Sequence, residues 1–324
     1  MATILVTGTA GFIGFHLAKE LLKDPKNRVI GIDNMNDYYS PLIKEKRNNI
    51  LKENRGYHFI KADIADFEEI MPELKGEKID QIVHLAAQAG VRYSIENPKV
   101  YAKSNIVGTL NIFEFARGAG IKKVVFASSS SVYGNSTKVP FSESDPVDRP
   151  ISLYAATKKS TELMAYTYSH LYGINMIGLR FFTVYGEFTR PDMATFKFAK
   201  SIISGKEIEV FNYGNMERDF TFVSDIVDGI LSAMGKDYRY EIFNLGNSKP
   251  VKLGYFIELL EKNLCVDAKK KMLPLQAGDV LTTYADLSKS EKMLGYKPKV
   301  PIEEGLKRFC VWFRENQEWL LELK

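Results

Sequence analysis

The sequence predicts an α/β fold in which a doubly wound parallel sheet is followed by a smaller C-terminal α/β domain. Up to Phe182, short runs rich in β-branched residues alternate with helical patterns, which is the order of parallel strands joined by helical crossovers. The runs Ile79–Leu85 and Lys123–Ala127 are almost continuously apolar, as expected of strands covered on both faces. After Phe182 the alternation becomes irregular, which indicates a second structural unit.

The individual elements follow from the spacing of apolar residues and from the turn residues between them. The expected strands are Ala2–Thr7, Arg28–Asp33, Tyr57–Asp63, Gln81–Ala86, Lys123–Ser128, Asn175–Phe182 and Glu207–Tyr213. The expected helices are Phe12–Lys23, Asn97–Gly118, Tyr154–Tyr172, Ala194–Ser204 and an amphipathic closing helix, Glu303–Asn316. We expect the first domain over residues 1–182 and the second over 183–324, with segments near 222–248 returning to the first.

The composition excludes several classes of protein. Hydrophobic residues make up 45% and charged residues 26% of the 324-residue chain, which is typical of a globular protein. A net charge of +4 is too small to indicate nucleic-acid or membrane binding. Two cysteines, Cys265 and Cys310, are too few for a disulfide framework or a metal cluster. We therefore expect a cytoplasmic protein without a metal, a nucleic-acid partner or a membrane span.

Three glycines follow the first expected strand at spacings of three. Gly8 permits a sharp turn, Gly11 lets the backbone approach a pyrophosphate, and Gly14 allows the next helix to pack on the sheet. The alternative is a tight turn that binds no ligand. Asp33 favours the ligand, because an acidic residue at the end of the next strand accepts a hydrogen bond from a ribose 2′-hydroxyl. Its charge would repel a 2′-phosphate, so the sequence favours NAD over NADP.

Asp63 follows the third expected strand, where it is either a contact on the adenine side of the dinucleotide or a helix N-cap.

A tyrosine and a lysine one helical turn apart form the second chemical signal. Tyr154 and Lys158 begin an expected helix, so their side chains share one face. The same spacing at Tyr57 and Lys61 falls on a strand, where four residues separate the side chains by roughly 13 Å. A phenol has a pKa near 10, and a nearby cation typically lowers such a value by about 1–3 units. Tyr154 is therefore a candidate general base.

A run of serines, residues 128–131, lies at the carboxyl end of the strand that begins at Lys123. This is the edge of an open α/β sheet where ligands bind. The run is either part of the site or a polar loop that caps the next turn.

Together these residues resemble the extended short-chain dehydrogenase/reductases, a family with the Rossmann fold. The matching motifs are Gly8/Gly11/Gly14, Leu85-Ala86-Ala87, Ser128–Ser131 with Val132-Tyr133-Gly134, and Tyr154/Lys158. Further segments are similar to UDP-glucuronate 4-epimerases. They are Asp33–Tyr39, Ala87–Arg92, Arg180–Gly186, Arg190–Met193, Gln276–Val280 and Tyr284–Asp286. The resemblance covers essentially the whole chain.

The resemblance implies a sugar-nucleotide epimerase that keeps NAD bound. Tyr154 would remove the proton of the sugar C4 hydroxyl, giving a transient 4-keto sugar. Lys158 would lower the pKa of Tyr154 and hold the nicotinamide ribose, and Ser129 matches the assisting Ser or Thr. The implied cofactor contacts are Gly8, Gly11, Phe12, Ile13, Gly14, Asp33, Asn34, Asp63, Ile64, Leu85, Ala86, Ala87, Tyr154 and Lys158.

The resemblance also implies how the UDP-sugar is held. Arg190 and Arg218 match diphosphate contacts, and guanidinium groups suit phosphate oxygens. Phe211, Tyr213 and Asp279 match contacts to the uridine. Thr183, with Ser130 and Ser131 opposite, would bind the C6 carboxylate of a glucuronate. The helices Asn97–Gly118 and Tyr154–Tyr172 are similar to the pair that forms the family's homodimer.

Other functions remain open at this point. UDP-glucose/UDP-galactose 4-epimerases are similar, but they usually carry Asn at the position of Thr183. A UDP-glucuronate decarboxylase shares the first oxidation. A 4,6-dehydratase is disfavoured, because Ser130-Ser131 stands where those enzymes typically have Asp-Glu. From another class, the protein could be a non-catalytic NAD-binding sensor, which Tyr154, Lys158 and Ser129 argue against.

Overall fold

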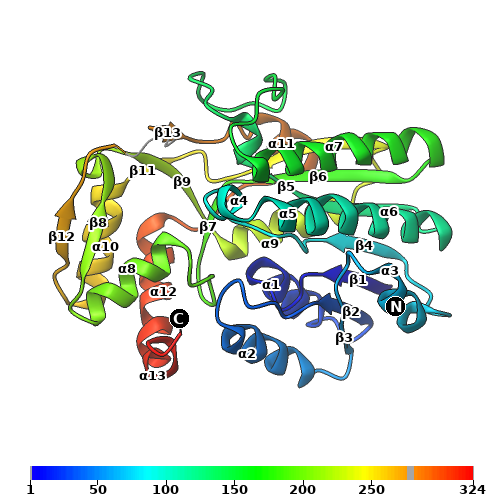
Figure 1. The fold of residues 1–324 in the computed structure, drawn as a ribbon, viewed down its shortest axis with the longest axis horizontal. Helices are drawn as coiled ribbons and strands as arrows, with labels where there is room; N and C mark the ends of the chain where they lie inside the picture. Colours follow the sequence, from blue (N-terminus) through cyan, green and yellow to red (C-terminus); the bar gives the residue numbers. More distant parts are fainter. Residues whose placement is uncertain (1, 276–280, 324) are drawn as a thin grey trace.

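Within residues 2–275 and 281–323, which the computed structural model describes, a central sheet has seven strands. They are β1 (Ala2–Thr7), β2 (Asn27–Asp33), β3 (Tyr57–Lys61), β4 (Gln81–His84), β5 (Lys123–Ser129), β6 (Asn175–Phe181) and β10 (Tyr240–Leu245). Their order is β10-β6-β5-β4-β1-β2-β3, and all neighbours are parallel (Figure 1). The order reverses between β1 and β4, which confirms the predicted doubly wound sheet.

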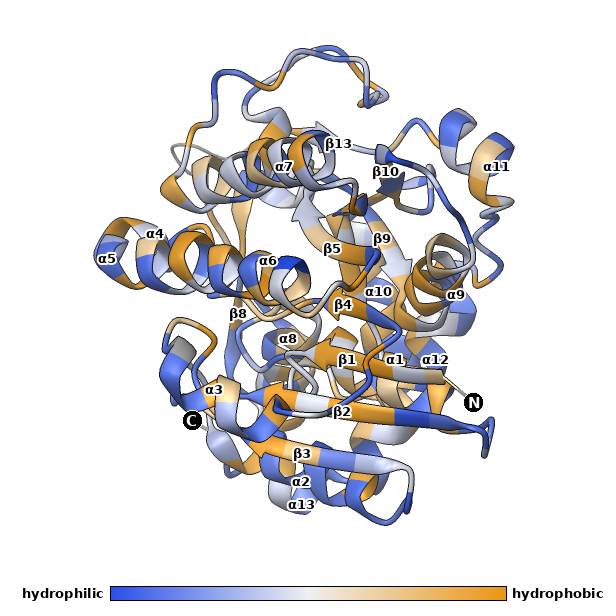
Figure 2. Ribbon diagram, turned by 90° about the vertical axis from the view of Figure 1, so that its right-hand side faces the viewer, coloured by the Kyte–Doolittle hydropathy of each residue, from blue (hydrophilic) through white to orange (hydrophobic). Residues whose placement is uncertain are grey.

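Helices cover both faces of this sheet. They include α1 (Phe12–Leu21), α2 (Pro41–Lys52), α3 (Phe67–Leu74), α6 (Gly108–Gly118), α7 (Leu153–Tyr172) and α9 (Val223–Met234). Neighbouring strand residues enter different cores: Ile4 packs with α1 and α9, whereas Leu5 packs with α6 and α7. Figure 2 shows the resulting apolar colour along β1, β4 and β5. Strands buried on both faces produce the continuous apolar runs seen in the sequence.

The expected helix Asn97–Gly118 is broken into shorter pieces. It consists of α5 (Pro98–Tyr101), a π-helical turn η1 (Ala102–Val107) and α6, and it follows the short α4 (Tyr93–Glu96). The buried Asn105 lies in η1, where its amide accepts a hydrogen bond from Gln88 N (2.7 Å) and donates to Gln88 O (3.0 Å). These bonds hold the wider π-helical turn against the loop after β4, which contains Gln88. The spacing of apolar residues in the sequence does not predict such a turn.

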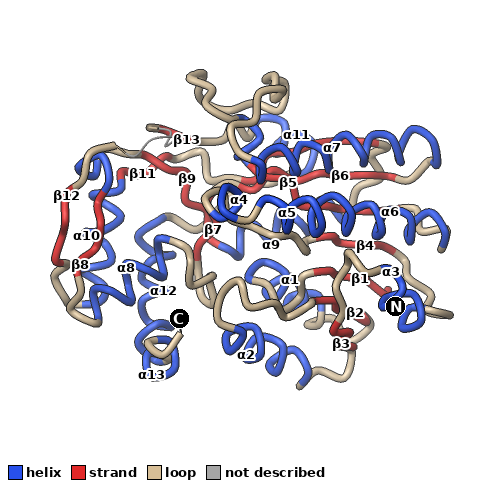
Figure 3. The backbone as a smooth tube through the Cα atoms, in the orientation of Figure 1, coloured by secondary structure: helices blue, strands red, loops and turns tan. Residues whose placement is uncertain are grey.

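The smaller C-terminal part has a second sheet and its own helices. The sheet contains β7 (Thr183–Tyr185), β9 (Glu217–Phe222), β11 (Pro250–Lys252) and β13 (Thr282–Thr283). Two further strands, β8 (Glu207–Val210) and β12 (Lys269–Met272), pair with each other. The helices are α8 (Ala194–Ile203), α10 (Leu253–Leu264), α12 (Ile302–Glu315) and α13 (Gln317–Leu320), whereas α11 (Ser288–Leu294) packs against β10 and α9. Figure 3 shows β8, β12, α8 and α10 grouped apart from the central sheet.

One expected strand in this part is shorter than predicted. The expected strand Glu207–Tyr213 ends at Val210, because the chain then turns through η3 (Phe211–Gly214), a 3₁₀ segment. Asn212 and Tyr213 have positive φ values of 48° and 52° there, which a strand does not tolerate.

The chain crosses back to the central sheet late in the sequence. β10 pairs in parallel with β6 and forms an edge of the central sheet. α9 packs against α1 and so belongs to the same layer. The domain boundary at 182/183 stays a prediction. Among the described residues, none of the helices combines the length and apolar character that crossing a membrane requires.

Candidate active site

A cavity of about 1270 Å³ lies at the carboxyl ends of the central strands. Asp33 ends β2 and Ser129 ends β5, while Gly8 and Leu85 directly follow β1 and β4, and all four residues line the cavity. Loops diverge here because the strand order reverses between β1 and β4, which opens a crevice for a ligand.

Most of the predicted site residues meet in this cavity. Those that line it are Gly8, Gly11, Phe12, Ile13, Gly14, Asp33, Asn34, Asp63, Ile64, Leu85, Ala86, Ala87, Ser129, Ser130, Ser131, Tyr154, Lys158, Thr183, Arg190 and Arg218. Phe211 and Tyr213 lie in η3 and are not brought to it. Asp279 lies outside the described residues.

The glycine turn at one end leaves no room for side chains. Gly8 has a φ of 79°, and a Cβ there would lie 2.9 Å from Ala86 N. A Cβ on Gly14 would lie 2.0 Å from the carbonyl oxygen of Gly8. Gly11 is the N-cap of α1. The turn therefore presents backbone and a helix N-terminus to the cavity, which together favour a bound phosphate.

Two carboxylates lie next to this turn. Asp33 accepts hydrogen bonds from Ala10 N (3.2 Å) and Met35 N (2.9 Å), so its orientation is fixed. Asp63 accepts from Ala65 N (2.9 Å). Its N-cap alternative is wrong, because α3 begins after Asp66. Asp63 instead faces the cavity from the end of the segment that follows β3.

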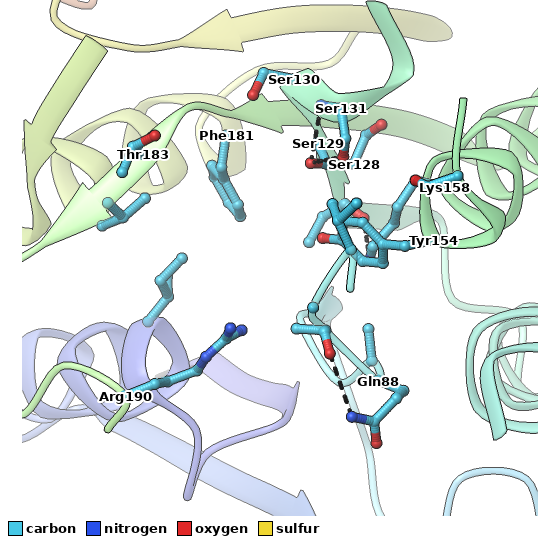
Figure 4. A pocket seen from close by; sticks show the side chains of 18 of the residues that line it. Gln88, Ser128, Ser129, Ser130, Ser131, Tyr154, Lys158, Phe181, Thr183 and Arg190 are labelled. Atoms are coloured by element: carbon cyan, nitrogen blue, oxygen red, sulfur yellow. Dashed lines mark hydrogen bonds between the residues drawn. The ribbon is translucent and has the colours of Figure 1, made fainter. Parts of the chain in front are cut away.

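Tyr154 and Lys158 project from the first turns of α7 (Figure 4). The Ser152 side chain caps this helix by accepting from Ala155 N (3.1 Å), which fixes where the first turn begins. Lys158 is buried and donates from Nζ to the carbonyl oxygen of Ala127 (2.9 Å). Burial lowers the pKa of Lys158 to about 8, so its ammonium form still predominates at pH 7.

Burial acts on the phenol in the opposite sense. It raises the pKa of Tyr154, while a hydrogen bond with Ser129 and the charge of Arg190 lower it. Ser129 in turn shares a hydrogen bond with the Ser131 hydroxyl (2.5 Å). Ser129 and Arg190 therefore favour the ionised form of Tyr154, but burial outweighs them and the pKa of the phenol is raised on balance. A direct contribution from Lys158 stays a prediction.

The opposite wall of the cavity carries Arg190. Its guanidinium points toward the space that Tyr154, Ser130 and Thr183 also border (Figure 4). Arg218 lines the cavity together with Leu281, Thr282 and Thr283. It donates from Nη1 to the carbonyl oxygens of Glu217 (2.9 Å) and Leu281 (3.1 Å). The two arginines thus serve different regions of the same cavity.

The described side chains offer no set of metal ligands. In the part of the chain that the structure describes, no three His, Cys, Asp or Glu side chains gather as they would around a metal ion.

Comparison with known proteins identifies the family. The model of the NAD dependent epimerase/dehydratase family matches residues 4–246. The chain belongs to that family. An uncharacterized protein of Methanocaldococcus jannaschii is 70% identical, over 99% of this chain and 98% of its own length. The UDP-glucuronate 4-epimerase of Thermodesulfobacterium geofontis is 45% identical over 100% of both chains.

A solved structure agrees with this assignment to the epimerase/dehydratase family. The crystal structure of UDP-glucuronic acid 4-epimerase from Bacillus cereus, in complex with UDP-glucuronic acid and NAD, matches with a TM-score of 0.89 at 33% identity. The match covers 97% of this chain and 99% of that one.

The cofactor of this epimerase/dehydratase protein is NAD, and the residues present fit it. The glycine turn forms a cradle that a Cβ would fill, and Asp33 stands beside it with its carboxylate held by backbone N–H groups. A carboxylate at this place accepts from a ribose 2′-hydroxyl and disfavours a 2′-phosphate.

Several cavity residues escaped the sequence reasoning. Lys44 lines the cavity from the first turn of α2. The signal in the sequence is Pro41, because proline is common at the first position of a helix and so marks where this turn begins. Tyr38 and Gln88 also line the cavity, and the resemblance of their segments, Asp33–Tyr39 and Ala87–Arg92, implies no role for either residue.

Proposed function

We propose that the protein is an NAD-dependent epimerase that interconverts UDP-glucuronate and UDP-galacturonate. One observation carries the proposal: the Tyr154 phenol, its partner Ser129 and the cation Arg190 border the same space, next to the glycine turn for NAD. The full-length similarity to a UDP-glucuronate 4-epimerase supports the same reading.

Tyr154 acts as the general base and acid. Its phenolate oxygen accepts the proton of the sugar C4 hydroxyl, and the resulting phenol returns that proton after the keto sugar has turned over. Ser129 hydrogen-bonds this phenol, and Arg190 favours its ionised form. The nicotinamide of bound NAD supplies reversible hydride exchange at C4, so the reaction has no net oxidation. Lys158 contributes a buried ammonium group one helical turn after Tyr154, held by its hydrogen bond to the carbonyl oxygen of Ala127.

The position of Arg190 favours a role at the sugar. The family resemblance implies diphosphate contacts for both Arg190 and Arg218. The charge of Arg190 lowers the pKa of Tyr154, and its guanidinium points toward the space that Tyr154 also borders (Figure 4), which supports a place near the reacting end of the sugar. We propose that Arg190, Thr183, Ser130 and Ser131 hold that carboxylate and that Arg218 binds the diphosphate. A charge-assisted pair of this kind suits a guanidinium.

Phe211, Tyr213 and Asp279 are proposed at the uridine. Tyr213 is 59% exposed, and Phe211 lies under the guanidinium of Arg92, 5.8 Å from it. Arg92 itself lines the cavity, so η3 adjoins a residue of the cavity wall, which supports this proposal.

One incubation tests the function. Purified protein is mixed with UDP-glucuronate, without added cofactor, and the products are separated. We expect UDP-galacturonate and no CO2. UDP-pentose with CO2 would instead identify a decarboxylase. Turnover of UDP-glucose alone would identify a neutral-hexose epimerase, and nucleotide-dependent binding to a macromolecule without any turnover would identify a sensor.

We propose that two copies pair through an apolar helical face. Val100 of α5, Val107 of η1, Leu110 of α6 and Leu163 of α7 are between 38% and 58% exposed. α7 packs against both η1 and α6, so these side chains belong to one side of the molecule. A second copy would remove them from water. Sedimentation at micromolar concentration as a single 36.8 kDa species would contradict this. We also propose a cytoplasmic location, in keeping with the free thiols of Cys265 and Cys310.

A further inference from the structure

Three segments that are far apart in the sequence meet beside Arg190. They are the loop after β2, which carries Tyr38, the loop after β4, which carries Gly90, and the segment after β7, which carries Asp192. Tyr38, Gly90 and Arg190 all line the cavity. Nothing in the proposed mechanism uses Tyr38 or Asp192.

Tyr38 is held tightly in this cluster. Its hydroxyl donates to Asp192 Oδ2 (3.1 Å). Its ring packs on Tyr93 with 4.7 Å between the ring centres. Gly90 has a φ of 105°, and a Cβ there would lie 2.3 Å from the Tyr38 hydroxyl. The absence of a side chain at Gly90 is therefore what allows the hydroxyl of Tyr38 to reach Asp192.

Asp192 in turn fixes the guanidinium of Arg190. Arg190 donates from Nε to Oδ1 (2.9 Å) and from Nη2 to Oδ2 (2.7 Å), a two-point contact. Both side chains are about three-quarters buried, at 21% and 24% exposed. Although burial opposes it, the charge of Arg190 lowers the pKa of Asp192, so the carboxylate stays ionised. Asp192 engages Nε and Nη2, Nη2 also donates to Met193 Sδ (3.7 Å), and the guanidinium points into the cavity (Figure 4).

We propose that Tyr38 is a positioning residue that acts through Asp192 to aim Arg190 at the carboxylate of the sugar. The inference rests on the proposed uronate specificity and deepens it. An arginine side chain loses considerable rotamer freedom when it is fixed, and prior fixing removes that cost from substrate binding. Tyr38 also belongs to the loop that begins at Asp33, so one loop serves both the cofactor ribose and the substrate arginine.

The proposal predicts different effects on the binding of two ligands. UDP-glucuronate carries a carboxylate at C6, whereas UDP-glucose carries a neutral hydroxyl there. A correctly oriented Arg190 therefore strengthens mainly the binding of UDP-glucuronate. Loss of the Tyr38 hydroxyl should therefore weaken UDP-glucuronate binding and leave UDP-glucose binding nearly unchanged. A general loosening of the fold would weaken both.

The test compares Tyr38→Phe with Tyr93→Phe in the full-length, NAD-loaded protein. Both changes remove one phenolic hydroxyl from the same ring cluster and alter no charge, but only Tyr38 donates to Asp192 in this pair. Calorimetric titration gives Kd for UDP-glucuronate and UDP-glucose. We expect Tyr38→Phe to raise the Kd for UDP-glucuronate about tenfold, as for one lost hydrogen bond to a charged group. Equal effects on both ligands, or no effect on either, would overturn the inference.

A double-mutant cycle tests whether Tyr38 acts through Asp192. In an Asp192→Ala background, Tyr38→Phe should have no further effect on the Kd for UDP-glucuronate. An undiminished additional loss would show that Tyr38 acts by another route. The wild-type protein is assayed for UDP-galacturonate formation in parallel. If the wild type forms none, the proposed function fails, whereas turnover with an unchanged ligand preference in Tyr38→Phe refutes only the role of Tyr38.

Discussion

Replacement of Tyr154 by Phe is the most direct test of the mechanism, because it removes one oxygen atom and little else. The ring of Tyr154 packs edge-on against Tyr101, with 6.1 Å between centres, and a Phe ring can keep this contact. The bond from Lys158 to Ala127 and the cap at Ser152 do not involve the phenol oxygen. The fold and NAD binding should therefore persist, while the proton acceptor for the C4 hydroxyl is lost.

The size of the effect follows from that role. A positioned acid–base group typically contributes about 10²–10⁴-fold, or about 3–5 kcal/mol in activation free energy. We expect kcat for UDP-galacturonate formation to fall by that factor, with Kd for UDP-glucuronate little changed. Tyr166→Phe is the matched control, because Tyr166 lies on the same helix but is 56% exposed. Activity of Tyr154→Phe close to that of the control would refute the assignment.

Three further changes probe the cofactor, the sugar and the lysine. Asp33→Asn should weaken NAD binding about tenfold, because a charged acceptor is lost, and should reduce the preference for NAD over NADP. Fluorescence titration with both cofactors measures the two affinities. An unchanged preference would argue against a contact between Asp33 and the ribose 2′-hydroxyl. Thr183→Asn should reduce kcat/KM for UDP-glucuronate more than for UDP-glucose, whereas equal losses would exclude a carboxylate contact. Because burial lowers the pKa of Lys158 to about 8, its charge is lost as pH rises through that value, and we expect kcat to decline there. Folding stability should instead increase as pH rises through the same range. The unfolded chain holds this proton up to its ordinary 10.5, so the cost of burying the charge is relieved as pH rises. In a pH series, Lys158→Arg, which stays charged, should lack the alkaline decline in kcat.

The sequence predicts the parts of the fold that depend on local spacing. Apolar runs identify the central strands, and the spacing of Gly8, Gly11 and Gly14 identifies the turn at the end of β1. Helical periodicity also places Tyr154 and Lys158 on one face of α7. Each of these features depends on residues that lie close together in the sequence, and such features are the ones that patterns capture.

Contacts between distant segments could not be predicted in the same way. The position of Arg190 opposite Tyr154 depends on how the segment after β7 leaves the sheet, and the bond from Tyr38 to Asp192 joins residues 154 positions apart. The π-helical turn at Asn105 depends on a polar contact with a different loop. Such long-range polar contacts have no period in the sequence, so motif resemblance could point to these segments but could not say what they touch.

We propose that the charges around Tyr154 couple cofactor binding to catalysis. Burial alone favours the neutral phenol, and the protein opposes it with a hydrogen bond from one side and the charge of Arg190 from the other. Arg190 is itself partly neutralised by Asp192, which limits how far it can stabilise a phenolate. Burial lowers the pKa of Lys158 to about 8, so Lys158 is still mainly cationic at pH 7. The balance therefore leaves the phenol protonated until a further positive charge arrives next to it. Under the proposed mechanism, oxidised NAD would bring that charge, so Tyr154 would become a base only when the cofactor is in the state that can accept a hydride.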